Sequence, residues 1–155
     1  MSFRILGLDP APFRHYYGQP DTALAASHVR RYVADTTPGF PDRIELRDVE
    51  PGESVLLLNY THQSGATPYR ASHAIFVREG AETPFDAVDT IPSCLRSRML
   101  SVRGFDRDDM MVDADLAEGA VLEDTIARML SDPAIAYLHA HYAKRGCFAA
   151  RIHRA

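Results

Sequence analysis

One run of four consecutive aliphatic residues, Val55 to Leu58, constrains the fold of this chain more than any other feature. It lies in an apolar stretch over residues 54–60, which follows the turn-forming pair Pro51-Gly52 and ends at the polar segment 61–70. Side chains alternate between the two faces of a sheet, so an unbroken run is typical of a strand covered on both faces. We therefore place this strand at the centre of a sheet. It is far too short for a membrane-spanning helix, which needs roughly 18 apolar residues.

Further strands are expected on both sides of this central strand. Residues 72–77 form a second apolar stretch, and the polar connection before it favours an antiparallel return. Arg43 to Arg47 alternates polar and apolar residues, which predicts a half-buried strand with Ile44 and Leu46 facing a core. The remaining strands are expected over residues 3–8, 29–33, 99–104, 110–116 and 147–153, with 99–104 and 110–116 forming a hairpin.

Helical patterns gather near the two ends of the chain. Short N-terminal helices are expected over residues 10–16 and 22–27, each after an aspartate that can cap it. An apolar stripe at helical spacing predicts a C-terminal helix through Leu122, Ile126, Met129 and Leu130. A second C-terminal helix is expected after Pro133, with Ile135, Leu138 and Tyr142 as its apolar stripe. This order predicts an α+β fold, with an antiparallel or mixed β-sheet covered by a C-terminal helix pair and short N-terminal helices.

Composition indicates one globular domain, expected to span residues 1–155. Of the 155 residues, 46% are hydrophobic and 25% are charged, which is close to the usage of a single soluble domain. The formal net charge is -4, from 17 basic and 21 acidic residues, which argues against electrostatic binding to nucleic acid or to an anionic membrane. The cysteines form no CxxC pair and no secretory signal is visible, so a reduced, cytoplasmic setting is expected.

Four segments of the chain together resemble a known family. They are Ser2-Phe3-Arg4-Ile5-Leu6-Gly7-Leu8, Pro38-Gly39-Phe40-Pro41, Leu57-Leu58-Asn59-Tyr60 and the stretch from Pro68 to Val77. On these segments the chain resembles the bacterial domain-of-unknown-function family DUF1203 over essentially its whole length. The Tyr-Arg-Ala-Ser-His stretch within the last segment is the most specific part of this resemblance. The resemblance implies a bacterial source and a single domain, and it implies no activity, because none is established for that family.

Polar residues gather around the connection between the two central strands. Asn59, His62, Tyr69, Arg70 and His73 flank the connection or lie in it. If the two strands pair as a hairpin, these side chains come to one rim of the sheet. Arg70 then offers a planar fork for carboxylate or phosphate, and an imidazole can move a proton near neutral pH. The sequence predicts a pocket for a small anionic molecule at residues 61–71, with Asn59, Tyr69 and Arg70 binding it and His62 and His73 supplying acid–base chemistry.

Two other interpretations stay open. These residues can have a purely structural role, in which Asn59 and Thr61 satisfy the turn, His73 is hydrogen-bonded at a strand start and Arg70 pairs with a surface acid. The protein can also be a non-enzymatic interaction protein or a homo-oligomer that uses an exposed strand or helix face. Whether the chain is an enzyme is not decided by any motif, since the GxSxG, GxGxxG and GxxxxGK patterns are all missing.

No metal and no cofactor are expected. On the expected second C-terminal helix, His139 and His141 point about 200° apart, because a helix has 3.6 residues per turn, and they cannot reach one ion. Cys94 and Cys147 are too isolated in sequence for a zinc pattern.

Two weaker charge clusters complete the candidates. Cys147 shares a face of the last expected strand with Arg151 and His153, whose positive charge would favour an ionised thiol, and the alternative is a buried structural cysteine. Three arginines near serines suggest an anion site, with a charged strand face as the alternative interpretation. They are Arg96, Arg98 and Arg103.

Overall fold

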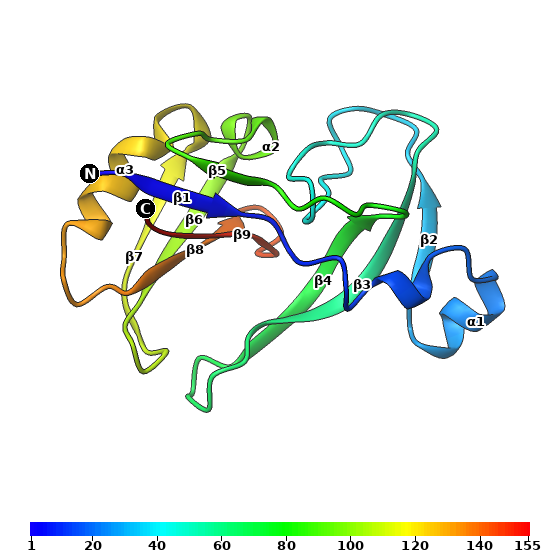
Figure 1. Ribbon diagram of the computed structural model, residues 1–155, viewed down its shortest axis with the longest axis horizontal. Coiled ribbons are helices and arrows are strands. Elements are labelled where there is room, and N and C mark those ends of the chain that lie inside the picture. Colours follow the sequence, from blue (N-terminus) through cyan, green and yellow to red (C-terminus); the bar gives the residue numbers. More distant parts are fainter.

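Nine strands form two antiparallel sheets in the computed structural model, which describes all 155 residues. The larger sheet has the order β5 (Asp86–Val88), β1 (Phe3–Leu6), β9 (Phe148–Arg154), β8 (Tyr137–Tyr142), β6 (Met99–Phe105) and β7 (Met111–Glu118). The smaller sheet has the order β2 (Arg30–Val33), β3 (Ser54–Gln63) and β4 (Ala71–Arg78). The two sheets lie side by side in Figure 1, with β8 and β9 toward β3 and β4. The α+β class is confirmed, and the one expected sheet is divided into two.

The expected strand pairs are confirmed within these sheets. The apolar strand β3 is the central strand of the smaller sheet, and β4 pairs with it in antiparallel register, with Leu58 opposite Ile75. β6 and β7 form the expected hairpin. The closing strand β9 lies between β1 and β8.

The helices are few and short. They are α1 (Asp21–Ala26), α2 (Ser93–Arg96) and α3 (Leu122–Leu130), with single 3-10 turns η1 (Arg14–Tyr16) and η2 (Gly119–Val121). The short N-terminal helices are thus confirmed as η1 and α1. At the C-terminal end, η2 leads directly into α3, and together they form the helical cover of the larger sheet (Figure 1). None of the helices has both the length and the apolar character needed to cross a membrane.

The prediction of a second helix after Pro133 is wrong, because residues Tyr137–Tyr142 form strand β8. All six side chains of β8 are buried, so its apolar residues face both sides of the sheet. Ile135, Leu138 and Tyr142 matched a helical stripe, but a short apolar run does not distinguish a buried strand from a helix by periodicity alone.

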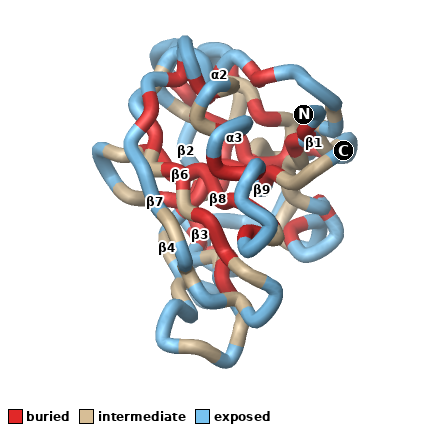
Figure 2. Tube along the Cα trace, turned by 90° about the vertical axis from the view of Figure 1, so that its left-hand side faces the viewer, coloured by how far each residue is buried: buried red, intermediate tan, exposed pale blue.

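Two main cores support the sheets. The larger core lies between α3 and the six-stranded sheet, where Ile126 and Met129 of the helix join Leu100 and Leu138 of the strands. Figure 2 shows buried residues in the middle of the molecule, around β6 and β8. A second core lies against the smaller sheet and joins Leu56 to Leu24 of α1. The face of the larger sheet opposite α3 is therefore the one that meets the smaller sheet.

Residues 41–48 tie the two sheets together, and they form turns rather than the half-buried strand expected for 43–47. Ile44 and Leu46 are buried as expected, at 0% and 1% exposure. The chain cannot stay extended here, because Leu46 has a left-handed φ of 52°. The backbone of Arg43 donates to the carbonyl of Phe76 in β4 and accepts from the amide of Leu8, which follows β1. This segment therefore links both sheets through single hydrogen bonds rather than through a ladder.

Candidate functional site

The two histidines of β8 lie on the face of the larger sheet that meets β3. Because β8 is a strand and not a helix, His139 and His141 share a face with Tyr137, which corrects the expectation that they point apart. Arg103 of β6 and Arg151 of β9 are the register partners of His139 on its two sides. Directly paired residues of antiparallel strands share a face. An arginine therefore stands on each side of His139.

The smaller sheet adds two more histidines to this face. The ring of His62 in β3 lies 4.8 Å from that of His141 and 6.3 Å from that of His139, measured between centroids. His73 in β4 is the partner of Tyr60, and it is close enough to His62 and His141 to lower their pKa values. The resulting group is here called the histidine–arginine cluster. Its members are His62, His73, His139, His141, Arg103 and Arg151.

Two β-bulges build this cluster. The register of β3 and β4 shifts between Thr61 and Gln63, so His62 is the additional residue. In β9 the register shifts so that Phe148 is opposite His141 and Ala150 is opposite Ala140, which leaves Ala149 as the additional residue. A bulge changes the side of the sheet that following side chains face. Phe148 is consequently on the histidine face, where its ring stacks on His62 at 5.7 Å and 8°.

Three imidazoles of the cluster, those of His62, His139 and His141, are held in the neutral form. Burial, together with nearby positive charge, lowers the pKa of His62 to about 4 and the pKa values of His139 and His141 to about 3. Burial is the largest cause for all three, because a low-dielectric surrounding disfavours the charged form. Arg103 adds electrostatic repulsion at each of the three rings. At neutral pH these rings therefore act as uncharged hydrogen-bonding groups.

Hydrogen-bonding capacity is left unused at three nitrogens of the cluster. His141 Nδ1 lies 2.9 Å from the carbonyl of Gly146 and, in the tautomer that donates to it, leaves Nε2 as an acceptor. This Nε2 is buried without a partner, and so are Nδ1 of His62 and Nδ1 of His139. Buried polar atoms without a partner are uncommon in folded proteins. The cluster thus offers several groups able to bond a polar ligand.

The two arginines of the cluster have no carboxylate partner. The only side-chain hydrogen bond of Arg103 goes to Ser101 Oγ at 3.3 Å, and burial lowers the pKa of this guanidinium. The guanidinium carbon of Arg151 lies 3.8 Å from the centre of the Tyr137 ring, in a cation–π contact. By contrast, Arg96 pairs with Glu123 and Arg98 with Asp48, so the three arginines suspected from sequence do not form one anion site.

The structure separates the five residues that the sequence predicts for the site. His62 and His73 both belong to the cluster. Tyr69 borders it, with its ring 6.5 Å from Phe105, which in turn contacts Tyr137 and His139. Arg70 is exposed and donates to the carbonyl of Ser64 within its own loop.

Asn59 lies away from the cluster. It is opposite Ala74, one position from the Tyr60–His73 pair, so alternation places it on the other face of the smaller sheet. Four residues of the cluster were not assigned to this site from the sequence, which considered His139 and His141 only as a metal pair, Arg103 only with Arg96 and Arg98, and Arg151 only beside Cys147. The signal that could have found the first two is the period-two pattern Tyr137-Leu138-His139-Ala140-His141, which a strand would place on one face.

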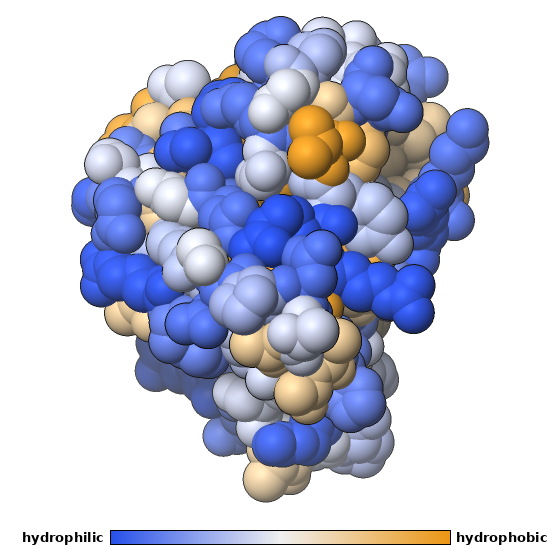
Figure 3. All heavy atoms as spheres, turned by 90° about the vertical axis from the view of Figure 1, so that its right-hand side faces the viewer, coloured by the Kyte–Doolittle hydropathy of each residue, from blue (hydrophilic) through white to orange (hydrophobic).

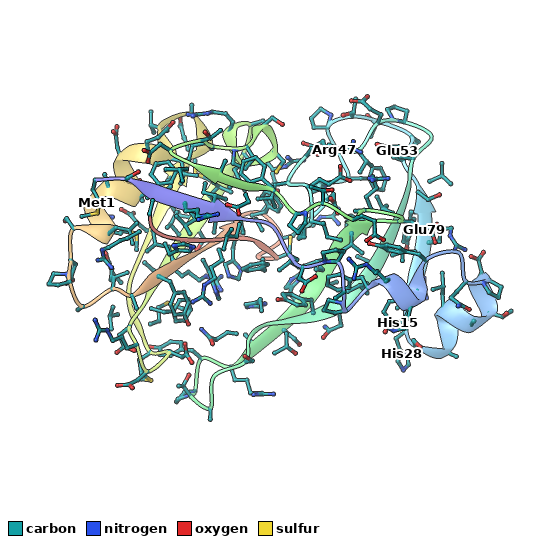
Figure 4. All side chains as sticks on the ribbon, in the orientation of Figure 1. Met1, His15, His28, Arg47, Glu53 and Glu79 are labelled. Atoms are coloured by element: carbon teal, nitrogen blue, oxygen red, sulfur yellow. The ribbon has the colours of Figure 1, made fainter.

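A shared metal ion is not supported by the geometry. No group of three or more histidine, cysteine, aspartate or glutamate side chains is arranged to hold one. The two arginines beside His139 would also repel a cation. The electrostatics of the cluster therefore favour an anion. Two other histidines, His15 and His28, take no part in the cluster, because they lie at the far end of the molecule near α1 (Figure 4).

Comparison with known proteins places the chain in a family. A family model described as "Protein of unknown function (DUF1203)" matches residues 39–154, a range that includes β3, β4, β6, β8 and β9 and so every strand of the cluster. No curated protein matches the chain, and no solved structure matches it. The match confirms the resemblance noted in the sequence. The chain belongs to the DUF1203 family of proteins of unknown function.

Proposed function

We propose that this protein binds a small anionic molecule at the histidine–arginine cluster. The observation that carries the proposal is that two arginines without a carboxylate partner, Arg103 and Arg151, lie beside three neutral imidazoles where the two sheets meet. A guanidinium presents planar donors that suit carboxylate or phosphate, and the partial burial of Arg103 strengthens the bonds that it would form. Arg103 and Arg151 take the charge-recognition role that the sequence suggested for Arg70.

Proton transfer is the chemistry that this arrangement can add. An anion beside His62 or His141 would favour the protonated ring and raise its pKa from the low value set by burial. Ligand binding would then be coupled to proton uptake, and a proton would be available next to the bound molecule. We assign the acid–base role to His62 and His73, which lie on the β3–β4 side, with Tyr69 at the border of the site.

The test compares two arginines of the same β6–β7 hairpin. Inorganic phosphate and a small dicarboxylate serve as probes, and binding is measured by calorimetry at pH 5.5, 6.5 and 7.5, values chosen around the usual histidine pKa of about 6.5. Arg103→Gln should weaken binding at least roughly tenfold, since a charge-assisted bond contributes about 1.5–3 kcal/mol. Arg107→Gln, at the exposed tip of the hairpin, should bind as the wild type does.

The pH series adds an independent requirement. Binding by the wild type should strengthen toward pH 5.5, because protonation of the rings accompanies binding, and the histidine resonances should move toward the protonated form when phosphate is added. Equal affinity of Arg103→Gln and wild type, or no binding of either probe at any pH, would refute the proposal.

One observation favours the alternative function, a non-enzymatic interaction or homo-oligomeric protein. The edge strand β7 exposes Val112 at 47% and Leu116 at 65%, and an unpaired edge with apolar side chains is suited to pairing with another chain. The opposite end of the molecule, over β2 and α1, is mainly hydrophilic with scattered hydrophobic side chains (Figure 3). The calorimetry separates the two functions, because an interaction protein without a ligand site has no reason to lose phosphate binding in Arg103→Gln alone.

A further inference from the structure

A pocket separate from the histidine–arginine cluster lies beside the turn between β8 and β9. It has a volume of about 500 Å³, and its lining includes Phe76 and Met99 together with residues of the turn. This volume is in the range of small-molecule sites. The pocket shares no side chain with the histidine–arginine cluster, so a ligand bound in it is independent of the proposed function.

The lining of this pocket is strongly basic. It contains Arg43, Arg98, Lys144 and Arg145 and no acidic residue. Arg98 is neutralised by a two-point ion pair with Asp48, at 2.6 and 2.8 Å. Lys144 and Arg145 are exposed and form no ion pair. The pocket therefore attracts anions through three charges, those of Arg43, Lys144 and Arg145, that are not paired with a carboxylate.

Arg43 is the buried charge of the pocket. It is 1% exposed, and it donates to two backbone carbonyls, those of Pro41 and Phe148. Its remaining donor, Nη2, lies 3.1 Å from Sγ of Cys147. The positive group beside this thiol is thus Arg43, rather than the Arg151 and His153 suggested by the sequence. Reactive cysteines are typically found beside a positively charged group of this kind.

Cys147 and Cys94 differ in their access to the pocket. Both belong to the larger core, but Cys147 is 8% exposed and lines the pocket, whereas Cys94 is 0% exposed and does not line it. Burial raises the pKa of Cys94 to about 11, which keeps that thiol protonated. The chain thus holds one cysteine at the wall of the pocket and, in Cys94, a fully buried cysteine that serves as an internal control.

We propose that this pocket binds small anionic disulfides and that Cys147 is the thiol with which they exchange. Cys147 first gives its proton to solvent, and its sulfur then attacks one sulfur of the bound disulfide. A new S–S bond joins Cys147 to half of the reagent, the original S–S bond breaks, and the other half leaves as a thiolate with the bonding electron pair. The disulfide itself is the oxidant, so no further reactant is needed.

The experiment uses two disulfide probes of different charge. Dithiobis-nitrobenzoate carries two carboxylates, and dithiodipyridine is neutral. The native protein should release one equivalent of the anionic thiol, and peptide mass mapping of the wild type should place the adduct on Cys147. Cys94→Ser should react as the wild type does, and Cys147→Ser should not react with either probe.

Charge variants test the role of the pocket. Replacing both exposed residues, Lys144→Gln with Arg145→Gln, should slow the anionic probe roughly threefold to tenfold and leave the neutral probe almost unchanged, because long-range attraction acts only on the charged reagent. Added salt should reduce the rate with the anionic probe in the wild type. An adduct on Cys94, a native Cys147 that reacts with neither probe, or an equal loss of rate for both probes would overturn the proposal.

Discussion

Two neutral imidazoles of the cluster, those of His139 and His141, make the free energy of unfolding depend on pH. The pKa values of His139 and His141 are lowered to about 3 in the folded protein, against about 6.5 for an unfolded histidine. Between these values the unfolded chain binds more protons, so the free energy of unfolding falls as pH falls from about 6.5 toward 3. Their contribution is complete above about pH 6.5. We expect each ring to add up to about 1.4 kcal/mol per pH unit to this slope.

Urea denaturation between pH 7 and pH 5 measures this slope. His139→Asn removes one titrating ring and should flatten it, whereas His15→Asn removes an exposed histidine outside the cluster and should not. The strongly shifted Glu53 does not affect this window, because Arg47 lowers its pKa to about 2 and its stabilisation is lost only below its unfolded value of about 4.5. The idea fails if both variants keep the slope of the wild type.

Elements made of strong local patterns could be predicted from the sequence, and those set by tertiary contacts could not. The apolar run of β3 and the helical stripe of α3 each determined their own structure. Strand β8 was misread because its apolar residues fill both faces and match either period. The bulges at His62 and Ala149 leave no local sequence signal, since pairing with the neighbouring strand creates them. The site was therefore predicted only on its β3–β4 side.

Gly7 shows how one residue limits the way the elements join. A Cβ atom at this position would lie 1.9 Å from the carbonyl oxygen of Ile44, which belongs to the turns that link the sheets. The backbone cannot move aside, because Gly7 donates to Phe85 and Phe85 donates to that same carbonyl. Gly7→Ala should therefore lower the free energy of unfolding by about 3 kcal/mol or more.

Gly18→Ala is the matched control for this substitution. Gly18 has a φ of +70°, and a Cβ atom added there would meet no other atom within 4 Å, so only backbone strain of about 1–2 kcal/mol opposes alanine. Urea midpoints of the two variants should differ clearly. Similar losses in both would show that the join between the sheets tolerates displacement.

At the scale of the whole molecule, one hydroxyl connects the two sheets at the end of the cluster. Tyr137 of β8 accepts a hydrogen bond from Gln63 of β3 at 2.8 Å and donates to the carboxylate of Asp109, in the β6–β7 turn. Thr67 in the β3–β4 loop also donates to the backbone of Asp109. The loop beside the cluster is thus held to the larger sheet by a short chain of polar contacts, which limits how far the sheets can separate.

Tyr137→Phe removes this connection and preserves the ring that stacks on Phe105. Gln63 is 3% exposed and would lose its acceptor, so unfolding should become easier by about 1–3 kcal/mol. Hydrogen exchange should accelerate most at residues 64–70, where the loop is released locally, and less in the core strands. Tyr69 is 37% exposed, so Tyr69→Phe should change the free energy of unfolding by no more than about 0.5 kcal/mol and leave the exchange of the loop unchanged. Slow exchange in the loop of Tyr137→Phe would contradict this prediction. It would mean that packing of the aromatic and imidazole rings alone holds the sheets together. Anion binding at the cluster would then need no movement of this loop.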